Sequence, residues 1–290
     1  MSATQPTTSG LSERKQARRE NWRLIVRRPA FIVGVAIVLF WVICALFPDF
    51  IAPHHPLDYR TGKHLPPGWG HLFGTDSTGR DVLSRVVAGA RDVLRIAPAA
   101  AILGVFFGVI LGLLQGYLGG WVDLLASRIV EAFLSLPVVL VGLLAITTLG
   151  RSNVVVIGVV AVLFTPIVAR TVRAAVLAER ELDYVTSAKL RGESKAFIMF
   201  REILPNVSGP IIVELTVRMG YAVFTVATLS FLGAGPPPPS PDWGVQVSDT
   251  YNNLIADFWW PTFFPAMAIA SLVIAVSLIA DSVQSVLEAS

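Results

Sequence analysis

AERELDYVTSAKLRGESKAFIMFREILP occupies residues 178–205, between two apolar stretches. Its first half predicts a short amphipathic helix, because three apolar side chains recur there at helical spacing: Leu182, Val185 and Ala188. Gly192 can end that helix at low steric cost. A second short helical run follows, and we expect Pro205 to close it because proline cannot continue a helix. The stretch therefore predicts two short helices with a glycine turn, either a docking surface at a membrane face or a bare linker.

The composition places the chain in a membrane. Of its 290 residues, 54% are hydrophobic and only 15% are charged, which lies outside the usual range of soluble globular domains. A helix needs roughly 20 residues to cross the hydrocarbon core. Six stretches without charge approach or exceed that length, namely 31–47, 96–122, 132–150, 152–169, 219–241 and 258–280. We therefore expect an all-α membrane protein with six transmembrane helices.

The charges give an orientation. Lys and Arg gather in the N-terminal tail and in residues 170–205, so the positive-inside rule predicts that both termini are cytoplasmic. The first apolar stretch has no small-residue cleavage pattern, and we expect it to be a retained helix rather than a signal peptide. The expected divisions are a basic cytoplasmic tail at 1–28, a first transmembrane helix at 29–50, an outer loop with a short helix at 51–95, and a core of five transmembrane helices at 96–290.

Glycine and proline mark the transmembrane helices. Small residues every four positions predict a face that packs closely on another helix, in this chain or in a partner: Gly104, Gly108 and Gly112, continued by Gly116. We expect a turn at residues 119–128 on the inner side. Pro137 and Pro166 should kink the third and fourth crossings.

Two further features concern the last crossings. Glu214 precedes Arg218 by one helical turn, so the two can pair near the membrane, which favours a structural anchor over a transport element. Trp243, Trp259 and Trp260 fit an aromatic belt at the membrane interface.

The first outer loop contains turn and cap chemistry between Gly74 and Arg85. Asp76, Arg80, Asp81 and Arg85 can form either a fixed element near the pore mouth or a capped turn with surface ion pairs. We expect a helix from Asp81 to Arg91. The irregular spacing of the loop histidines favours polar loop residues over metal ligands: His54, His55, His64 and His71.

These residues together resemble the transmembrane permease subunits of bacterial ATP-binding-cassette (ABC) importers, in the branch for dipeptides, oligopeptides and nickel. Ser187-Ala188, Gly192 and Ile203-Leu204-Pro205 fit the pattern of that family's cytoplasmic loop, although Ser187 stands where alanine is more common. Further family patterns occur in order at 71–85, 119–123 and 229–233. The resemblance covers about three-quarters of the chain.

The resemblance implies an ABC importer type I permease fold and a set of functional residues. ATPase coupling would fall on residues of the 178–205 loop: Asp183, Tyr184, Ser187, Ala188, Lys189, Gly192, Phe197, Leu204 and Pro205. An outer gate or loop element would use Asp76, Arg80, Asp81 and Arg85.

The same resemblance implies partners and a location. We expect a second homologous permease subunit, two ATP-binding-cassette ATPase subunits and an extracytoplasmic substrate-binding protein, assembled in the lipid of a bacterial cytoplasmic (inner) membrane. The chain would form half of a translocation pathway for peptides or a similar small solute. We expect no cofactor and no metal in this chain, with ATP and Mg bound by the partner ATPase subunits.

Other function classes have less support. A secondary transporter or channel driven by an ion gradient calls for ionisable residues at the membrane midplane, and only Glu214 and Arg218 come near it. A mere scaffolding anchor would not need so much Gly and Pro in its helices. The sequence has no P-loop, H-E-x-x-H or G-x-S-x-G motif, so we expect no enzyme. No basic stripe interleaved with aromatics indicates nucleic-acid binding.

Overall fold

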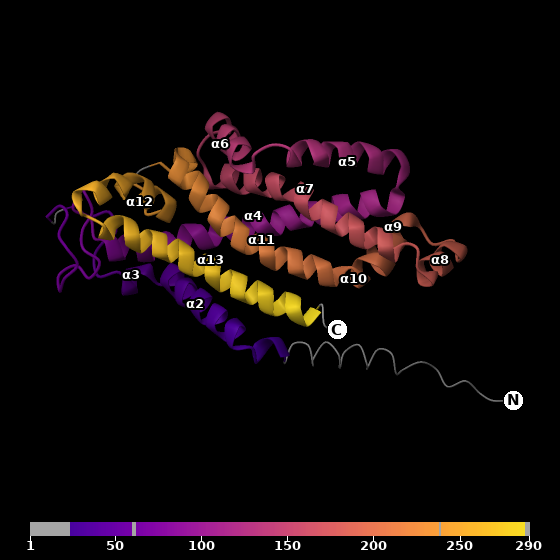
Figure 1. The fold of residues 1–290 in the computed structure, drawn as a ribbon, viewed down its shortest axis with the longest axis horizontal. Coiled ribbons are helices and arrows are strands. Elements are labelled where there is room, and N and C mark those ends of the chain that lie inside the picture. Colours follow the sequence, from indigo (N-terminus) through magenta and orange to yellow (C-terminus); the bar gives the residue numbers. More distant parts are fainter. Residues whose placement is uncertain (1–23, 60–61, 238, 288–290) are drawn as a thin grey trace.

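The computed structural model describes residues 24–59, 62–237 and 239–287, so most of the basic tail lies outside the described residues. Within them the chain is helical, with two isolated β-bridges and no named strand. The long helices run along one axis, with α12 near one end and α8 near the other (Figure 1). The elements are α2 (Pro29–Leu46), α3 (Pro48–Ile51), α4 (Val82–Leu118), α5 (Gly120–Leu134), α6 (Val138–Leu149), α7 (Asn153–Glu179), α8 (Asp183–Leu190), α9 (Lys195–Phe197), the π-helix η1 (Ile198–Ile203), α10 (Leu204–Asn206), α11 (Ser208–Leu229), the π-helix η2 (Ser230–Ala234), α12 (Trp243–Thr250), the 3-10 helix η3 (Tyr251–Ala256) and α13 (Trp260–Leu287).

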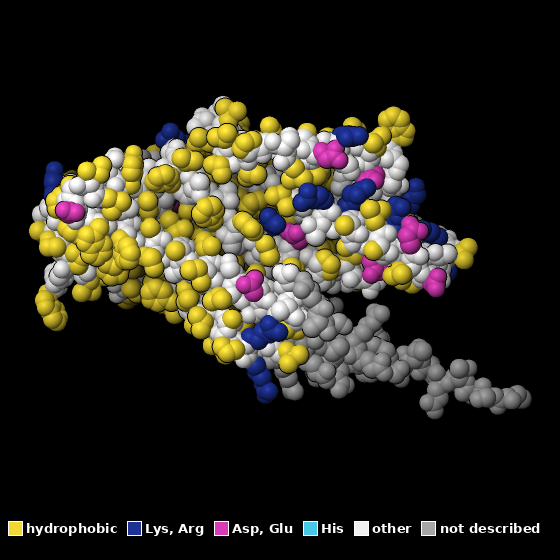
Figure 2. All heavy atoms as spheres, in the orientation of Figure 1, with side chains coloured by type: hydrophobic (Ala, Val, Ile, Leu, Met, Phe, Trp, Pro, Cys, Tyr) yellow, Lys and Arg dark blue, Asp and Glu magenta, His cyan; other side chains and the backbone are white. Residues whose placement is uncertain are grey.

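Five helical segments in the described part of the chain are long and apolar enough to cross a membrane: α2, α4, α7, α11 with η2, and α13. The pair α5 and α6 passes the same test together but is bent by 90° between them, so the number is up to six if that pair is one span. The expectation of an all-helical, multi-pass membrane protein is confirmed. Figure 2 agrees, because hydrophobic side chains spread over the long helices while most of the visible Lys, Arg, Asp and Glu gather toward the α8 end.

Three expected boundaries are wrong. The first membrane helix does not reach residue 50, because Phe47 leaves helical geometry and Pro48 starts the separate α3. The short helix expected at Asp81–Arg91 is not separate from the second crossing, since α4 runs unbroken from Val82 to Leu118 and so begins inside the expected loop 51–95. The turn expected at 119–128 is already helical from Gly120.

The third crossing is broken rather than kinked. Helix α5 ends at Leu134, and Pro137 becomes the N-cap residue of α6 in an extended conformation (φ −62°, ψ 112°). A proline lacks the backbone N–H that would continue the helix, and here the chain turns instead of bending slightly. Pro166, in contrast, lies inside an uninterrupted α7.

The closest packing of two long helices joins α4 to α7. A Cβ atom added at Gly104 would lie 2.9 Å from the Cβ of Phe164, and one added at Gly108 would lie 2.5 Å from the Cβ of Val168. The corresponding distance from Gly112 to the Cβ of Val172 is 2.7 Å, and Gly116 repeats the pattern one turn later. The glycine face of α4 therefore packs on a helix of the same chain, and only glycine leaves room for α7 at this distance.

A second packing layer holds α2 against α13. The indole Nε1 of Trp41 donates a hydrogen bond to the hydroxyl of Ser271 at 2.9 Å, in the part of both helices that packs together. A Cβ on Gly34 would lie 2.6 Å from the carbonyl oxygen of Ala275. The first helix is thus fixed to the last one, beside α11 and α4 (Figure 1).

Gly108→Leu should separate α4 from α7, because its added side chain would occupy the space of Val168. Overpacking of a tight interface typically costs about 1–3 kcal/mol, so we expect a lower thermal unfolding midpoint and a severalfold lower yield of protein from membranes. The matched control is Gly158→Leu on α7, where an added Cβ meets no atom of the described residues within 4 Å. Equal stability of the two variants would contradict the packing assignment.

Candidate functional site

Helix α8 is held at the end of the long helices by its buried face. Val185 and Ala188 are fully buried and belong to an apolar cluster with Val172 and Val176 of α7 and Leu113 of α4. Asp183 in the first turn and Lys189 in the last turn complement the helix dipole. Leu182, which the helical spacing placed on the buried face, is instead 47% exposed, because it precedes the helix as its N-cap residue.

A glycine-dependent cap ends α8. The N–H of Gly192 donates to the carbonyl of Lys189 at 3.0 Å, and the N–H of Glu193 donates to the carbonyl of Ala188 at 3.2 Å. These two bonds form a Schellman motif, which requires a left-handed residue between helix and loop. Gly192 has φ +76°, and no described atom lies within 4 Å of where its Cβ would be. The position therefore selects glycine for its backbone conformation, as the sequence predicted, and not for lack of space.

The second helical run ends differently from the expectation. Ser194 caps α9 by accepting the N–H of Phe197 at 3.2 Å, and the chain then passes through η1. Pro205 does not close the run, because α10 continues through it to Asn206. A local π-helical adjustment is one way in which a helix accommodates the hydrogen bond that a proline removes.

The structure divides the predicted loop residues into two groups. Ala188 is buried and Tyr184 and Leu204 are half-buried, so these three hold the loop in place rather than present a surface. The exposed group consists of Asp183, Ser187, Lys189, Gly192, Phe197 and Pro205. The prediction missed Leu190, an apolar side chain that is 85% exposed between Lys189 and Arg191. Its position off the Val185–Ala188 face is the signal that could have found it.

Polar bonds tie the loop to the ends of α4 and α7. The hydroxyl of Tyr184 donates to the Glu179 carboxylate at 2.6 Å, and burial together with this bond raises the pKa of Tyr184 to about 12. Arg180 Nη1 donates to the carbonyl of Gly116 at 2.8 Å. Lys189 Nζ lies 5.9 Å from the centre of the Tyr117 ring. These contacts attach the loop to both helices of the glycine interface.

An ion pair joins the start of α5 to α7. Arg173 binds both carboxylate oxygens of Asp123, at 2.5 Å through Nε and 2.7 Å through Nη2. Such bidentate pairs fix geometry as well as charge. The bent α5–α6 pair is thus attached to the same α7 that carries the loop.

The other predicted cluster lies at the opposite end, in a region we call the polar cap: residues 62–86, α12 and the start of α13. The Asp76 carboxylate accepts hydrogen bonds from the N–H and hydroxyl of Thr78 and from the N–H and Nε of Arg80. Burial alone would raise the pKa of Asp76, but these bonds and the Arg80 charge outweigh it and hold the pKa below its ordinary value. Arg85 Nε lies 3.8 Å from the same carboxylate.

Asp81 and Arg85 connect the cap to α4 and α12. Asp81 is the N-cap residue of α4 and accepts the N–H and hydroxyl of Ser84 at 2.8 and 2.7 Å. Arg85 is 2% exposed and donates to the carbonyl of Ser240 at 2.9 Å. The structure thus joins Asp76, Arg80 and Arg85 in one cluster, while the Asp81 carboxylate makes separate bonds to Ser84 and His71.

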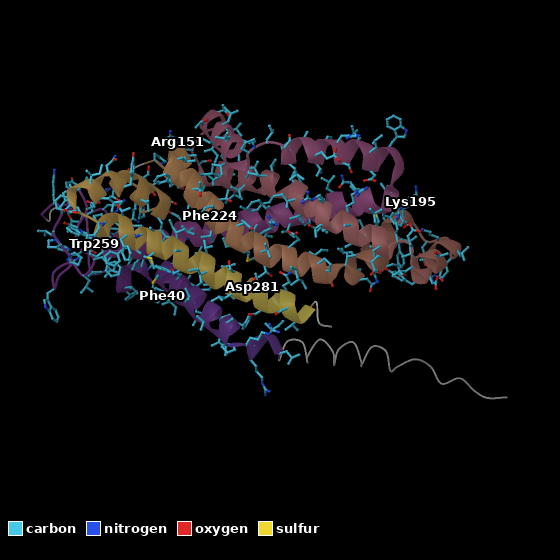
Figure 3. All side chains as sticks on the ribbon, in the orientation of Figure 1. Phe40, Arg151, Lys195, Phe224, Trp259 and Asp281 are labelled. Atoms are coloured by element: carbon cyan, nitrogen blue, oxygen red, sulfur yellow. The ribbon has the colours of Figure 1, made fainter. Side chains whose placement is uncertain are left out.

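Two tryptophans expected in an aromatic belt are buried in this cap. Trp243 is 0% exposed and donates to the carbonyl of Val86 at 2.7 Å, while Trp260 is 7% exposed and donates to the carbonyl of Thr75 at 3.0 Å. Only Trp259 of the three is exposed, at 48%; Figure 3 places it at the cap, opposite the Lys195 end. An indole that finds a carbonyl partner can be buried, which explains the difference.

The predicted pair in α11 forms as expected. Arg218 Nε donates to Glu214 at 2.9 Å, and the Thr171 hydroxyl of α7 donates to the other oxygen of Glu214 at 2.8 Å. The Arg218 guanidinium also lies 5.1 Å from the centre of the Tyr221 ring. These satisfied partners support an anchoring role between α11 and α7.

Comparison with known proteins identifies the architecture. Residues 104–290 match the model of the family described as binding-protein-dependent transport system inner membrane component. The chain belongs to this permease family. Residues 17–67 also match the N-terminal transmembrane domain of oligopeptide transport permease C. Membership makes the chain a permease of an ABC importer with the type I fold, and it sets aside a gradient-driven carrier.

Several relatives cover nearly the whole permease. A putative peptide transport system permease of Brucella suis is 37% identical over 92% of this chain and 90% of that protein. The dipeptide transport system permease of Escherichia coli is 37% identical over 93% of this chain and 92% of its own length. The corresponding Bacillus subtilis protein is 34% identical over 93% of this chain and 85% of its own.

The polar cap gives a pH-dependent prediction. Burial raises the pKa of Asp242, the N-cap residue of α12, from 3.8 to about 6. The folded state therefore holds the proton more tightly, and stability is lost as pH rises from 3.8 through 6, by up to about 3 kcal/mol. Asparagine caps equally well without the charge. Asp242→Asn should be more stable than wild type at pH 8, with the difference shrinking toward pH 4.

Thermal unfolding of the purified permease at pH 4.5 and pH 8 checks this. Asp49→Asn serves as the control, because Asp49 is exposed and its change should move neither midpoint. A lower midpoint for Asp242→Asn than for wild type at pH 8 would show that the charge is needed in the fold.

Proposed function

We propose that this chain is one of two permease subunits of a bacterial inner-membrane importer for peptides, and that the 178–205 loop is where ATPase subunits dock. The peptide assignment is supported by relatives whose names specify peptide or dipeptide transport. In this arrangement both termini and α8 face the cytoplasm, and the polar cap faces the extracytoplasmic substrate-binding protein. A second, homologous permease completes the pathway, and ATP with Mg is bound by the two ATPase subunits.

The observation that carries the docking proposal is the division of α8 into a buried and a projecting face. Val185 and Ala188 anchor the helix, while Asp183, Lys189 and the 85% exposed Leu190 project from the body. An apolar side chain flanked by charges, at the tip of a rigid element, is suited to a protein groove. In Figure 2 most of the visible charged side chains gather toward this end.

The route by which loop movement reaches the pathway follows from the contacts of α8. ATPase subunits that close on nucleotide would displace α8, and the bonds of Tyr184 and Arg180 would transfer this movement to α7 and α4. The glycine interface then carries α4 along with α7, because it leaves no gap in which one could slide past the other. Thr171 and Glu214 extend the connection to α11.

A substitution at Gly192 tests the proposal. Gly192→Val forces a β-branched residue to φ +76°, at a cost of roughly 1–3 kcal/mol. This strain should displace α8 from its packing against α7 and α4. We expect the protein to insert and to pair with the second permease, while substrate-stimulated ATP hydrolysis falls at least fivefold. Gly192→Asn is the matched control, since asparagine tolerates the left-handed region and should keep more than half of the stimulation.

The measurement is ATPase activity of the purified complex, with and without peptide-loaded binding protein, together with peptide uptake in vesicles. Wild-type stimulation and uptake by Gly192→Val would identify the loop as a linker and remove the docking assignment. An equal loss of ATPase stimulation in the Val and Asn variants would show that side-chain bulk at position 192 matters, and not the backbone conformation there.

A further inference from the structure

Two histidines distant in sequence meet at the polar cap. His54 follows α3, and its N–H donates to the Ser84 hydroxyl of α4 at 3.1 Å, which fixes this turn against the start of α4. His71 is held by an antiparallel bridge to Gly68. The two imidazole rings lie with their centroids 4.7 Å apart, inclined by 34°. Their irregular spacing in the sequence concealed this proximity.

Both rings face one carboxylate oxygen. The Nδ1 atoms of His71 and His54 lie 2.8 and 3.8 Å from Oδ1 of Asp81, and all three ligand atoms lie within 4.8 Å of one another. Ligands of a tetrahedral zinc ion stand roughly 3.3 Å apart, given Zn–N and Zn–O bonds of about 2.0–2.1 Å. The observed distances bracket that value, so small side-chain rotations would complete three ligand positions.

The carboxylate has an oxygen to spare for this role. Oδ2 of Asp81 caps α4 by accepting both bonds from Ser84, while Oδ1 faces only the histidines among the contacts found in the described residues. A hydrogen bond between His71 and Oδ1 would explain the position of His71, but not why the ring of His54 lies beside it. The site thus joins three segments: the turn after α3, the loop before α4, and α4 itself.

The cluster also has an entry path. The Asp81 side chain is 1% exposed and that of His71 12%, but that of His54 is 41% exposed and borders a cavity of about 520 Å³. Asp49 and Asp92 line this cavity together with the cationic Arg91. The positive end of the α4 helix dipole should weaken the affinity for a cation by roughly fivefold. The negative charge of Asp81 opposes this effect.

We propose that His54, His71 and Asp81 form a site for a divalent first-row transition-metal ion such as Zn²⁺, with water in the remaining position. Two imidazole nitrogens and one carboxylate oxygen are a donor set that such ions bind and that Mg²⁺ and Ca²⁺ do not favour. The ion would fasten the turn after α3 to the start of α4 and stiffen the polar cap. This proposal is independent of peptide transport.

The test uses the full-length permease, purified in detergent and stripped with a chelator. Zn²⁺ is titrated in competition with a chromophoric chelator, and the thermal unfolding midpoint is followed with and without saturating Zn²⁺. We expect one Zn²⁺ per chain and a raised midpoint. His54→Ala should weaken binding at least tenfold and abolish the midpoint shift, without harming the apo protein, because its side chain is the most exposed of the three.

His55→Ala is the matched control, because this neighbouring histidine lies in the same turn but outside the cluster. It should change Zn²⁺ affinity less than twofold. The proposal is overturned if wild type binds no Zn²⁺ in the micromolar range, if His54→Ala binds it as well as wild type, or if His55→Ala weakens binding as much as His54→Ala. The last result would indicate chelation by surface histidines in general.

Discussion

The fold depends on the close approach of α4 and α7. Four glycines on one face of α4 bring the two backbones so near that single Cβ atoms would collide with α7 side chains and carbonyls. In lipid there is little hydrophobic gain from helix association, so such packing supplies much of the specificity. The 178–205 loop begins where α7 ends, and Arg180 bonds back to the α4 carbonyl of Gly116. The loop is therefore attached to this helix pair.

The polar cap is the complementary constraint at the other end. Asp76, Asp81 and Arg85 are buried there. Hydrogen bonds satisfy the two carboxylates, and Arg85 donates through Nη2 to Ser240, while its Nη1 has no hydrogen-bond partner among the described residues. Removing one member of such a network leaves a buried group unpaired, which costs more than the net value of the bond. Indole bonds from Trp243 and Trp260 close the cap over the start of α4. The permease thus has a buried polar cap at one end and a loop attached to the α4–α7 pair at the other.

Local rules accounted for the features that depend on a few neighbouring residues. The four-residue glycine spacing predicted a packing face, and Gly192 predicted the end of a short helix, because both follow from helix geometry. The partner of the glycine face was left open, since periodicity does not say which helix fills it. A short helix was expected from Asp81 to Arg91, but the length of that helix was underestimated because charges were taken to end the membrane segment.

The remaining errors have a common cause. The local sequence allows two conformations or burial states equally well, and tertiary contacts decide between them. Pro137 permits either a kink or a break, and the structure has a 90° bend between α5 and α6. Trp243 and Trp260 could have faced lipid, but carbonyl partners from Val86 and Thr75 allowed burial. The meeting of His54 with His71 depends on the turn after α3, which no spacing encodes.

The central claim is that the loop, α7 and α4 move as one body during ATP-driven transport. Spin labels at Lys195, in α9 within the loop (Figure 3), and at Val154, near the start of α7, measure this directly in a Cys44→Ser background. The distance along α7 is roughly 40 Å for 27 residues, within reach of pulsed dipolar spectroscopy. In complexes trapped with closed ATPase subunits, the account predicts a change of less than about 2 Å. A change near one helical turn, roughly 5 Å, would show that the loop moves separately from α7 and would contradict it.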